Sequence, residues 1–312
     1  MLKIGMISAA TYGYQTAPRT PGSNHGTAFA TTFNGWQEEK VSRHKWTFVR
    51  SRRKLVGARV LKIWDPQAEW AQKMAEACSI DTVCRTPEEA CEGMDAVIVI
   101  DDGSGEHGAY ARYPLSKGIA TFCDKPMSMS PKRAGELVKL ARSTGARFMS
   151  SSALRFVPEI VKLRNELAQI GPVYLATVAC GNDLIYYGVH ALSMAYAVLG
   201  PGAVSAMNVG QPGLNQVRVR FADHRDVLVL VGEKQWMSSS YQISLYGQKA
   251  WRNLTPDLGD LYYYLLEAFV SYAETGKEPY PVEDELELLA ALEAGRRSLL
   301  ERREVTLKEV LA

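Results

Sequence analysis

The sequence predicts an α/β protein in two parts: a doubly wound parallel sheet, then an α+β domain with a largely antiparallel sheet. In the first part, short apolar stretches alternate with amphipathic helical stretches, which indicates βαβ crossovers and a parallel sheet. In the second part, strand-like stretches follow one another with only turns between them, as in an antiparallel meander. A length of 312 residues suits two domains, each large enough to bury its own core.

The first domain, which we expect to be Rossmann-like, shows alternating strands and helices along the chain. Its expected strands are apolar over most of their length, which is typical of strands buried on both faces, and they cover 2–8, 60–64, 95–100, 120–123 and 147–150. Its expected helices carry apolar residues at three- and four-residue spacing, and they cover 26–39, 69–77, 87–91, 107–117 and 131–144.

The second domain changes this organisation. Its expected strands are separated by Gly, Pro, Asn and Asp turns and cover 171–180, 204–209, 216–221, 226–232 and 241–246. Its expected helices cover 158–169, 188–199, 260–275 and 282–303. We place the first domain at 1–126 and the second at 127–312, with the boundary somewhere between 126 and 150. The C-terminal helix packing back on the first domain stays open.

The composition gives no sign of a nucleic-acid or membrane partner. The net charge is +2, with 46% hydrophobic and 22% charged residues. No apolar run approaches the roughly 18 residues of a membrane span, and the chain runs into its first strand without a signal-peptide pattern. The five cysteines show neither CxxC pairs nor zinc-finger spacing. We expect a cytoplasmic protein with reduced thiols, no metal and a small-molecule partner.

Lys125 follows the strand expected at 120–123, within the run Asp124-Lys125-Pro126. Proline fixes its own φ and keeps the preceding residue extended, so Lys125 cannot continue into a helix. It therefore stands at the carboxyl end of a strand, where open α/β sheets bind their ligands. The pattern fits an amine aimed at a substrate, and it fits a snorkelling surface lysine equally well.

The turn after the first strand lacks most of the dinucleotide fingerprint G-x-G-x-x-G. The corresponding run from Gly5 to Ala10 keeps only the first glycine, and a long loop over 11–24 follows it. Gly5, Ser8 and His25 are candidates for cofactor contacts, because backbone amides at a helix start bind anions. A helix cap without any ligand fits the same residues.

Asp65 ends the second expected strand and is followed by Pro66. An acidic residue at this point commonly accepts hydrogen bonds from an adenosine ribose. Its charge would repel a 2′-phosphate, which favours NAD over NADP. An Asp-Pro turn residue without a ligand is the alternative.

Asp101 and Asp102 follow the strand expected at 95–100 and are further candidates for cofactor contacts. Two adjacent carboxylates repel a pyrophosphate unless a cation or a basic side chain lies between them. Lys125 or His107 is placed to supply that charge. A metal held together with Glu106 is a weaker alternative, because the spacing matches no established ligand set.

A second group of candidate residues surrounds the start of the helix expected at 188–199. His190 lies in the first turn, where the helix dipole lowers its pKa and keeps the imidazole neutral. A neutral imidazole accepts a proton from a hydroxyl that is being oxidised, although a capping or packing histidine fits the same pattern. Tyr186 and Tyr187 offer phenols to a sugar-like ligand, and Asp183 is placed to orient either of them.

Together these motifs resemble the Gfo/Idh/MocA family of glucose–fructose oxidoreductase and inositol dehydrogenase type. The family's Glu-Lys-Pro motif appears as Asp-Lys-Pro at 124–126, and its histidine helix resembles the stretch that opens with Gly188-Val-His190. The run 276–281 and the final helix match the family's C-terminal closure. The likeness covers nearly the whole chain.

The resemblance implies an NAD(P)-dependent oxidoreductase that transfers hydride to or from a sugar, polyol or related hydroxyl compound. It implies that Lys125 contacts the substrate hydroxyl and the nicotinamide region and that His190 accepts the proton, both at one cleft. His107 resembles the family's histidine after the fourth strand and is a further substrate contact. The resemblance also implies a homo-oligomer, either a dimer or a tetramer, formed through the exposed face of the C-terminal sheet.

Departures from the family pattern leave a second function open. The glycine fingerprint is degenerate, the run 101–103 replaces the usual Thr-Pro-Asn turn, and Tyr186 stands where an aspartate is common. These features favour a non-catalytic ligand-binding or regulatory protein of the same fold with a degenerate cofactor site. The retained Lys125 and His190 favour the enzyme.

Overall fold

The computed structural model describes residues 1–13, 18–105 and 107–312, and in it the chain forms two compact units. The first unit comprises residues 1–129, 136–150 and 262–279. The second comprises residues 130–135, 151–261 and 280–312. The chain thus returns to the first unit late in the sequence, whereas the residues after 279 belong to the second. The division into domains after residue 126 stays a prediction.

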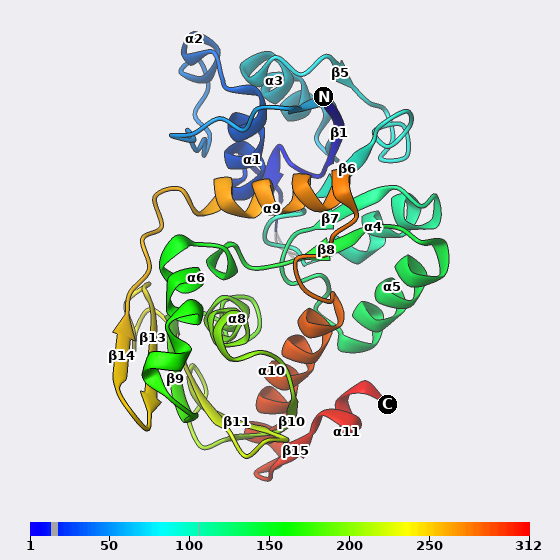
Figure 1. Cartoon of the computed structure of the whole chain (residues 1–312). Helices are drawn as coiled ribbons and strands as arrows, with labels where there is room; N and C mark the ends of the chain where they lie inside the picture. Colours follow the sequence, from blue (N-terminus) through cyan, green and yellow to red (C-terminus); the bar gives the residue numbers. More distant parts are fainter. Residues whose placement is uncertain (14–17, 106) are drawn as a thin grey trace. The chain divides into compact units, whose positions relative to one another are not determined.

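The first unit is built on a six-stranded parallel sheet in the order β5-β4-β1-β6-β7-β8 (Figure 1). The strands are β1 (Leu2–Ile7), β4 (Ala58–Trp64), β5 (Thr82–Val83), β6 (Ala96–Val99), β7 (Ala120–Cys123) and β8 (Phe148–Ser150). The strand order reverses between β1 and β6. Open α/β sheets bind ligands beside the carboxyl ends of the strands at such a reversal.

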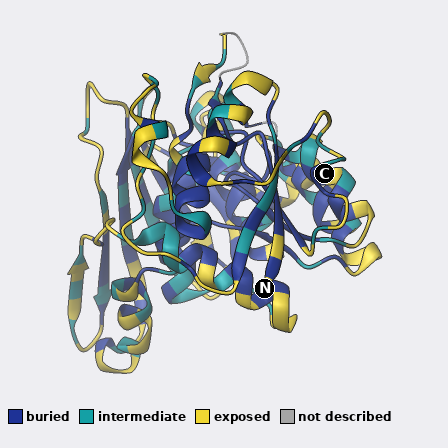
Figure 2. Cartoon of the chain, turned by 90° about the horizontal axis from the view of Figure 1, so that it is seen from above, coloured by how far each residue is buried: buried dark blue, intermediate teal, exposed yellow. Residues whose placement is uncertain are grey.

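Helices pack against this sheet, and every residue of β6 and β7 is buried, as expected for a parallel sheet covered on its faces. Figure 2 shows the chain coloured by burial, with buried residues in dark blue. The helices are α1 (Asn24–Asn34), α2 (Glu38–Val41), α3 (Ala68–Cys78), α4 (His107–Ser116), the later part of α5 (Pro131–Thr144) and α9 (Leu261–Thr275) without its first residue. Two short antiparallel strands, β2 (Thr11–Tyr12) and β3 (Thr20–Pro21), belong to the long loop that follows β1.

Two expected helices of this unit differ from the structure. The helix expected at 26–39 ends at Asn34, because Gly35 adopts a φ of 76° and turns the chain before α2 begins. The helix expected at 87–91 is wrong, since these residues form single turns. Cys91 N–H donates to the Glu88 carbonyl and Met94 N–H to the Cys91 carbonyl, which is too little to nucleate a helix.

The second unit contains a seven-stranded mixed sheet in the order β14-β13-β9-β12-β11-β10-β15. Its strands are β9 (Val173–Gly181), β10 (Ala203–Asn208), β11 (Leu214–Phe221), β12 (Asp226–Gly232), β13 (Tyr241–Gly247), β14 (Trp251–Leu254) and β15 (Val305–Thr306). Neighbouring strands are antiparallel except β9 and β12, which run parallel. The fold class that the sequence predicts, a Rossmann-like sheet plus a largely antiparallel one, is confirmed.

The helices of the second unit are η1 (Ala153–Arg155), α6 (Pro158–Asn165), α7 (Leu167–Ile170), α8 (Gly188–Leu199), α10 (Glu283–Glu301) and α11 (Leu307–Leu311). Burial alternates along β11 and β12, so one face of this sheet is covered while residues of the other are partly or fully exposed. Helices α8 and α10 contact the strands of this sheet. In the described part of the chain, no helix has the length and apolar character needed to cross a membrane.

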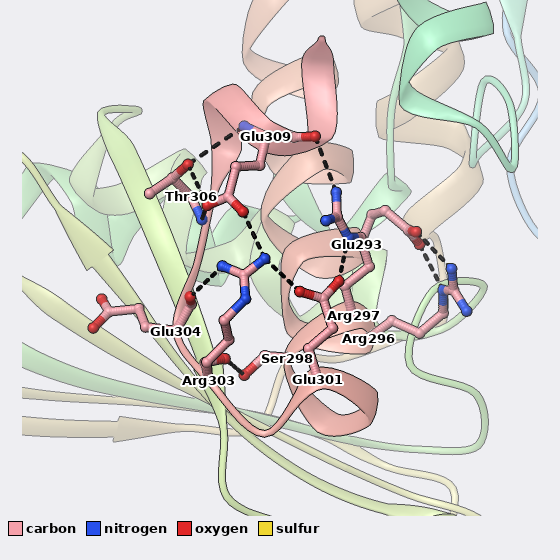
Figure 3. Close-up of polar contacts among 9 residues, drawn as sticks. All are labelled: Glu293, Arg296, Arg297, Ser298, Glu301, Arg303, Glu304, Thr306 and Glu309. Carbon is pink, nitrogen blue, oxygen red and sulfur yellow. Dashed lines mark hydrogen bonds and ion pairs between the residues drawn. The ribbon is translucent and has the colours of Figure 1, made fainter.

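Polar contacts on the surface fasten the end of the chain to α10 (Figure 3). Thr306 and Glu309 form a capping box at the start of α11. Arg303 donates to Glu309 over 2.7 Å, and Arg297 of α10 donates to the Glu309 carbonyl over 2.9 Å. Such surface pairs each contribute only about 0–1 kcal/mol, so burial of Leu307 supplies much of the attachment.

We expect Gly26→Ala to lower the free energy of unfolding by about 1–3 kcal/mol, as overpacking typically does. Gly26 lies in the first turn of α1, where an added Cβ would come 1.9 Å from the Ala9 carbonyl oxygen. Urea unfolding measures the effect. The control is Gly135→Ala in α5, where the nearest atom, on Leu286, is 3.7 Å away and alanine should stabilise by about 0.5–1 kcal/mol. Equal losses in both variants would contradict the close packing of α1.

Candidate functional site

Lys125 lies directly after β7 and is 2% exposed. The pairing of β7 with β6 continues one residue past the strand, because Asp124 N–H donates to the Val99 carbonyl over 2.8 Å. The Lys125–Pro126 peptide bond is cis. At 2% exposure the Lys125 side chain does not extend into bulk water, so the alternative of a snorkelling surface lysine is excluded.

Histidines and a carboxylate surround this strand end in the first unit. His25 Nδ1 lies 2.5 Å from Asp124 Oδ2, and both side chains are largely buried. Burial lowers the pKa of His25, but the Asp124 and Asp102 carboxylates together outweigh it, so the net shift is upward. His107 is fully buried, neither of its ring nitrogens has a hydrogen-bond partner among the described residues, and burial lowers its pKa. His107 is therefore neutral at pH 7.

Arg19 supplies the basic group beside Asp101 that the sequence requires. Its Nη1 lies 3.1 Å from Asp101 Oδ1, and its Nη2 donates to Ser8 Oγ over 3.0 Å. Its Nε donates to Thr11 Oγ1 over 2.6 Å. The sequence suggested Lys125 or His107 for this position. Arg19 was missed because it lies in an irregular loop where no periodic pattern gives its direction.

Asp65 is buried and points back onto the chain. Its Oδ2 accepts the backbone N–H groups of Ala10 over 2.9 Å and Thr11 over 3.1 Å. Its Oδ1 accepts the Thr11 hydroxyl over 2.8 Å and the Gln67 N–H over 2.9 Å. Burial raises the pKa of Asp65 despite these bonds. Both oxygens thus hold the loop after β1, which removes the basis for preferring NAD over NADP.

Asp102 lies at the start of α1. Ser23 caps this helix by accepting the Gly26 N–H over 2.9 Å, and its hydroxyl donates to Asp102 Oδ2 over 3.1 Å. In dinucleotide-binding domains this end of the helix faces the pyrophosphate. In this chain a carboxylate stands beside it instead.

Gly5 was expected to act in the turn after the first strand, but it lies inside β1. An added Cβ there would come 2.0 Å from the Ala90 carbonyl oxygen, so its missing side chain serves packing. The residue that turns the chain after β1 is Ser8, with a φ of 54°. As it stands, this edge of the sheet does not fit a dinucleotide in the ordinary pose. The acceptors of Asp65 and the N–H groups of the turn are already engaged within the chain.

In the second unit, His190 occupies the first turn of α8. Its Nδ1 lies 2.7 Å from Ser152 Oγ, which also accepts the Leu154 N–H over 3.2 Å and so caps η1. The rings of Tyr187 and Tyr241 lie edge-on to the imidazole, with centroids 5.9 and 5.5 Å away. Ser152 and Tyr241 were missed by the sequence analysis because they approach His190 from other elements.

Tyr186, Tyr187 and Asp183 lie just before α8, as the sequence indicates. The two tyrosine rings are 5.9 Å apart. Asp183 Oδ1 accepts the N–H groups of Ile185 and Tyr186 over 2.8 and 2.7 Å, so it shapes the turn into the helix. This backbone role differs from the expected task of orienting a tyrosine.

A buried ion pair involves Arg155, the last residue of η1, three residues after Ser152. Arg155 Nε is 3.3 Å from Glu285 Oε1, and both side chains are about 5% exposed or less. The Arg155 guanidinium also stacks 3.7 Å above the Tyr280 ring. Burial raises the pKa of Glu285 to about 7, although Arg155 and the Tyr280 hydroxyl oppose the shift. No local pattern in the sequence indicates this pair.

The site residues thus fall into two sets. Ser8, Asp101, Asp102, His25, His107 and Lys125 share the carboxyl edge of the parallel sheet, whereas Asp183, Tyr186, Tyr187 and His190 belong to the second unit. The convergence of Lys125 and His190 on one cleft stays a prediction. Glu106 lies outside the described residues. Within them, no group of three or more His, Cys, Asp and Glu side chains is arranged to hold a metal ion.

Comparison with known proteins gives a family match over residues 20–152, to the Gfo/Idh/MocA model described as an oxidoreductase family with an NAD-binding Rossmann fold. Trans-1,2-dihydrobenzene-1,2-diol dehydrogenase of Bos taurus is 30% identical over 119 residues, which are 37% of this chain and 36% of that protein. The chain spans about a third of the length of this relative. Inositol 2-dehydrogenase of Rhizobium meliloti is 24% identical over 306 residues, 80% of this chain and 92% of that protein.

Solved structures share the fold over the full length. A probable dehydrogenase from Thermotoga maritima superposes with a TM-score of 0.79, covering 99% of this chain and 100% of that one at 17% identity. At this identity the likeness supports the fold alone.

We expect Arg19→Ala to lower the free energy of unfolding by about 2–4 kcal/mol, because it removes the cation paired with buried Asp101. Urea unfolding of the double variant Arg19→Ala/Asp101→Asn should recover part of the loss. The control is Arg59→Ala, whose exposed pair with Asp81 should contribute about 0–1 kcal/mol. A loss no larger than that of the control would show that the Asp101 charge is compensated elsewhere.

We expect stability to fall between pH 5 and 8 through Glu285. A carboxyl with a pKa of about 7 in the folded state and 4.5 otherwise binds more protons when folded. Its favourable contribution is therefore present below pH 4.5 and lost as pH rises through 7. Glu285→Gln should remove up to about 3 kcal/mol of this pH dependence in urea unfolding. Exposed Glu274→Gln should leave it unchanged, and identical pH profiles for both variants would refute the shift.

Proposed function

Residues 20–152 match the model of the Gfo/Idh/MocA family of NAD-binding, Rossmann-fold oxidoreductases, and from this match we propose that the chain is an NAD(P)-dependent dehydrogenase. Its substrate is a sugar, polyol or related compound that carries a hydroxyl group. The names of its relatives, which include inositol 2-dehydrogenase and D-glucoside 3-dehydrogenase, support this class of substrate.

The single observation that carries the proposal is the buried Lys125 at the carboxyl end of β7. Burying an ammonium group is costly. A buried lysine therefore indicates that its amine interacts with polar groups. The position is the ligand edge of an open α/β sheet. A cationic amine at this point polarises a substrate oxygen and stabilises the negative charge that develops on it.

His190 is the proposed proton acceptor. To accept a proton at Nε2, His190 must carry its ring proton on Nδ1, whose N–H then donates a hydrogen bond to Ser152 Oγ. Ser152 is held by its own bond to the Leu154 N–H, so it fixes the orientation of the ring. Tyr186 and Tyr187 are proposed substrate contacts beside this imidazole, and His107 a further one beside Lys125.

NAD or NADP is the proposed cofactor, as the description of the family match indicates. The internal bonds of Asp65 and Arg19 must exchange partners before a dinucleotide occupies the carboxyl edge of β1 and β6.

A homo-oligomer formed through the outer face of the second sheet is also proposed. Large apolar side chains are exposed on its strands, among them Tyr174 at 54% and Trp251 at 72%. Exposed aromatic residues of this size commonly mark interfaces between protein chains.

A second candidate function is a non-catalytic ligand-binding or regulatory protein of the same fold. The engaged oxygens of Asp65 and the Asp102 carboxylate beside α1 favour it, because both oppose dinucleotide binding.

We expect Lys125→Ala to reduce turnover about a hundredfold or more while nucleotide binding changes little. The assay follows absorbance of the reduced nucleotide with a panel of sugars and polyols, and Lys117→Ala is the control on the surface. Full activity of Lys125→Ala on the substrate found would remove Lys125 from the mechanism.

Thermal unfolding with NAD and NADP separates the two candidate functions. A nucleotide at 100 times its dissociation constant stabilises the folded state by about 2.7 kcal/mol. The enzyme should shift its midpoint with at least one nucleotide at millimolar concentration. Unchanged midpoints with both would favour the non-catalytic protein.

A further inference from the structure

The short contact between His25 and Asp124 lies next to the proposed catalytic lysine. His25 Nδ1 and Asp124 Oδ2 are 2.5 Å apart, and the two side chains are 12% and 2% exposed. Asp124 immediately precedes Lys125, so the carboxylate and the amine project from adjacent backbone positions. The contact joins residues 99 positions apart in the sequence.

Both partners are held in place by their elements. His25 is the second residue of α1, whose start is fixed by the Ser23 cap. Its ring is flanked by Phe29 and Tyr262, with centroids 6.0 and 5.2 Å away. On the other side, Asp124 is fixed by its N–H bond to the β6 edge. The geometry therefore does not depend on a mobile surface side chain.

The charged groups that act on His25 follow two neighbouring strands, β6 and β7. Asp124 after β7 and Asp102 after β6 raise its pKa, whereas Lys125 lowers it. The Tyr262 ring lies 5.2 Å from the imidazole, centroid to centroid, and is tilted by 58° to it. Burial raises the pKa of Asp124, but the charge and hydrogen bond of His25 outweigh it and hold that pKa below its usual value. Both shifts favour the imidazolium–carboxylate form of this contact.

We propose that His25 is a positioning residue for Lys125: by binding Asp124, it sets the orientation and the share of negative charge that this carboxylate offers to the neighbouring amine. The proposal rests on the proposed function only in giving Lys125 a role toward substrate. With His25 protonated, part of the Asp124 charge is compensated by the imidazolium. With His25 neutral, the carboxylate acts more strongly on the lysine.

Coupled groups influence each other equally, which makes the proposal measurable. If the Lys125 charge lowers the proton affinity of His25, protonated His25 lowers that of Lys125 by the same free energy. A packing histidine that only fills space beside Phe29 would show no such coupling.

The experiment is an NMR titration of protein labelled in its histidine rings and at lysine Cε, with no nucleotide or substrate added. His25→Gln and Lys125→Met identify the two signals. We expect the His25 ring to titrate above its ordinary value of 6.5 in the unaltered protein. Lys125→Met should raise that midpoint by about half a unit or more, and Asp124→Asn should lower it by about one unit or more. The control Lys117→Met removes the same charge from the surface and should leave it unchanged.

The lysine signal gives the second readout. The Lys125 Cε resonance should change at the midpoint of His25 and lose this inflection in His25→Gln. A His25 midpoint unmoved by Lys125→Met, or a His25 ring that is neutral at pH 6.5 in the unaltered protein, would overturn the proposal. The second result needs only the assignment by His25→Gln, so it holds even if Asp124→Asn fails to fold. Because neither readout uses turnover, a failure of the dehydrogenase assignment remains distinguishable.

Discussion

The compensation of buried carboxylates at the carboxyl edge of the parallel sheet is the constraint on which the rest of the first unit depends. Asp65, Asp101, Asp102 and Asp124 are each less than 5% exposed, and isolated buried charges cost several kcal/mol. Each carboxylate has a partner from within the chain: backbone amides, a guanidinium, a capping hydroxyl or an imidazole. Their compensation fixes the loop after β1, the start of α1 and the end of β7 in one arrangement.

This arrangement explains how a Rossmann-like sheet forms without a glycine-rich turn. In the ordinary domain, glycines bring the backbone close to a pyrophosphate whose charge meets the start of the first helix. In this chain, Ser8 makes the left-handed turn, and Asp102 places negative charge at the helix start. Contacts within the chain thus lie at the edge where the ordinary domain contacts its ligand. Charges interact more strongly away from water, so the charges of neighbouring residues act strongly on buried Lys125 at this edge.

The second unit uses a comparable arrangement around its histidine. Ser152 lies within hydrogen-bond distance of His190, and Arg155, three residues after Ser152, forms a buried ion pair with Glu285. From the sequence, His190 was identified by its place in the first turn of a helix, and Lys125 by the proline that follows it. Both predictions needed only local rules. Ser152, Arg155 and Arg19 were not found, because serine and arginine are common in loops and only a distant partner makes them special.

The sequence by itself determined the fold class, the strand and helix periodicity and the exit of Lys125 from a buried strand, since hydrophobic spacing and proline geometry act within a few residues. It did not determine that Gly5 serves packing, that Asp65 turns inward or that residues 87–91 form turns. Only the tertiary structure decided that Arg19 meets Asp101 across 82 residues and that His25 meets Asp124 across 99. The physical reason is that a buried charge takes whichever partner the packed elements bring within hydrogen-bond distance, and that choice has no local pattern.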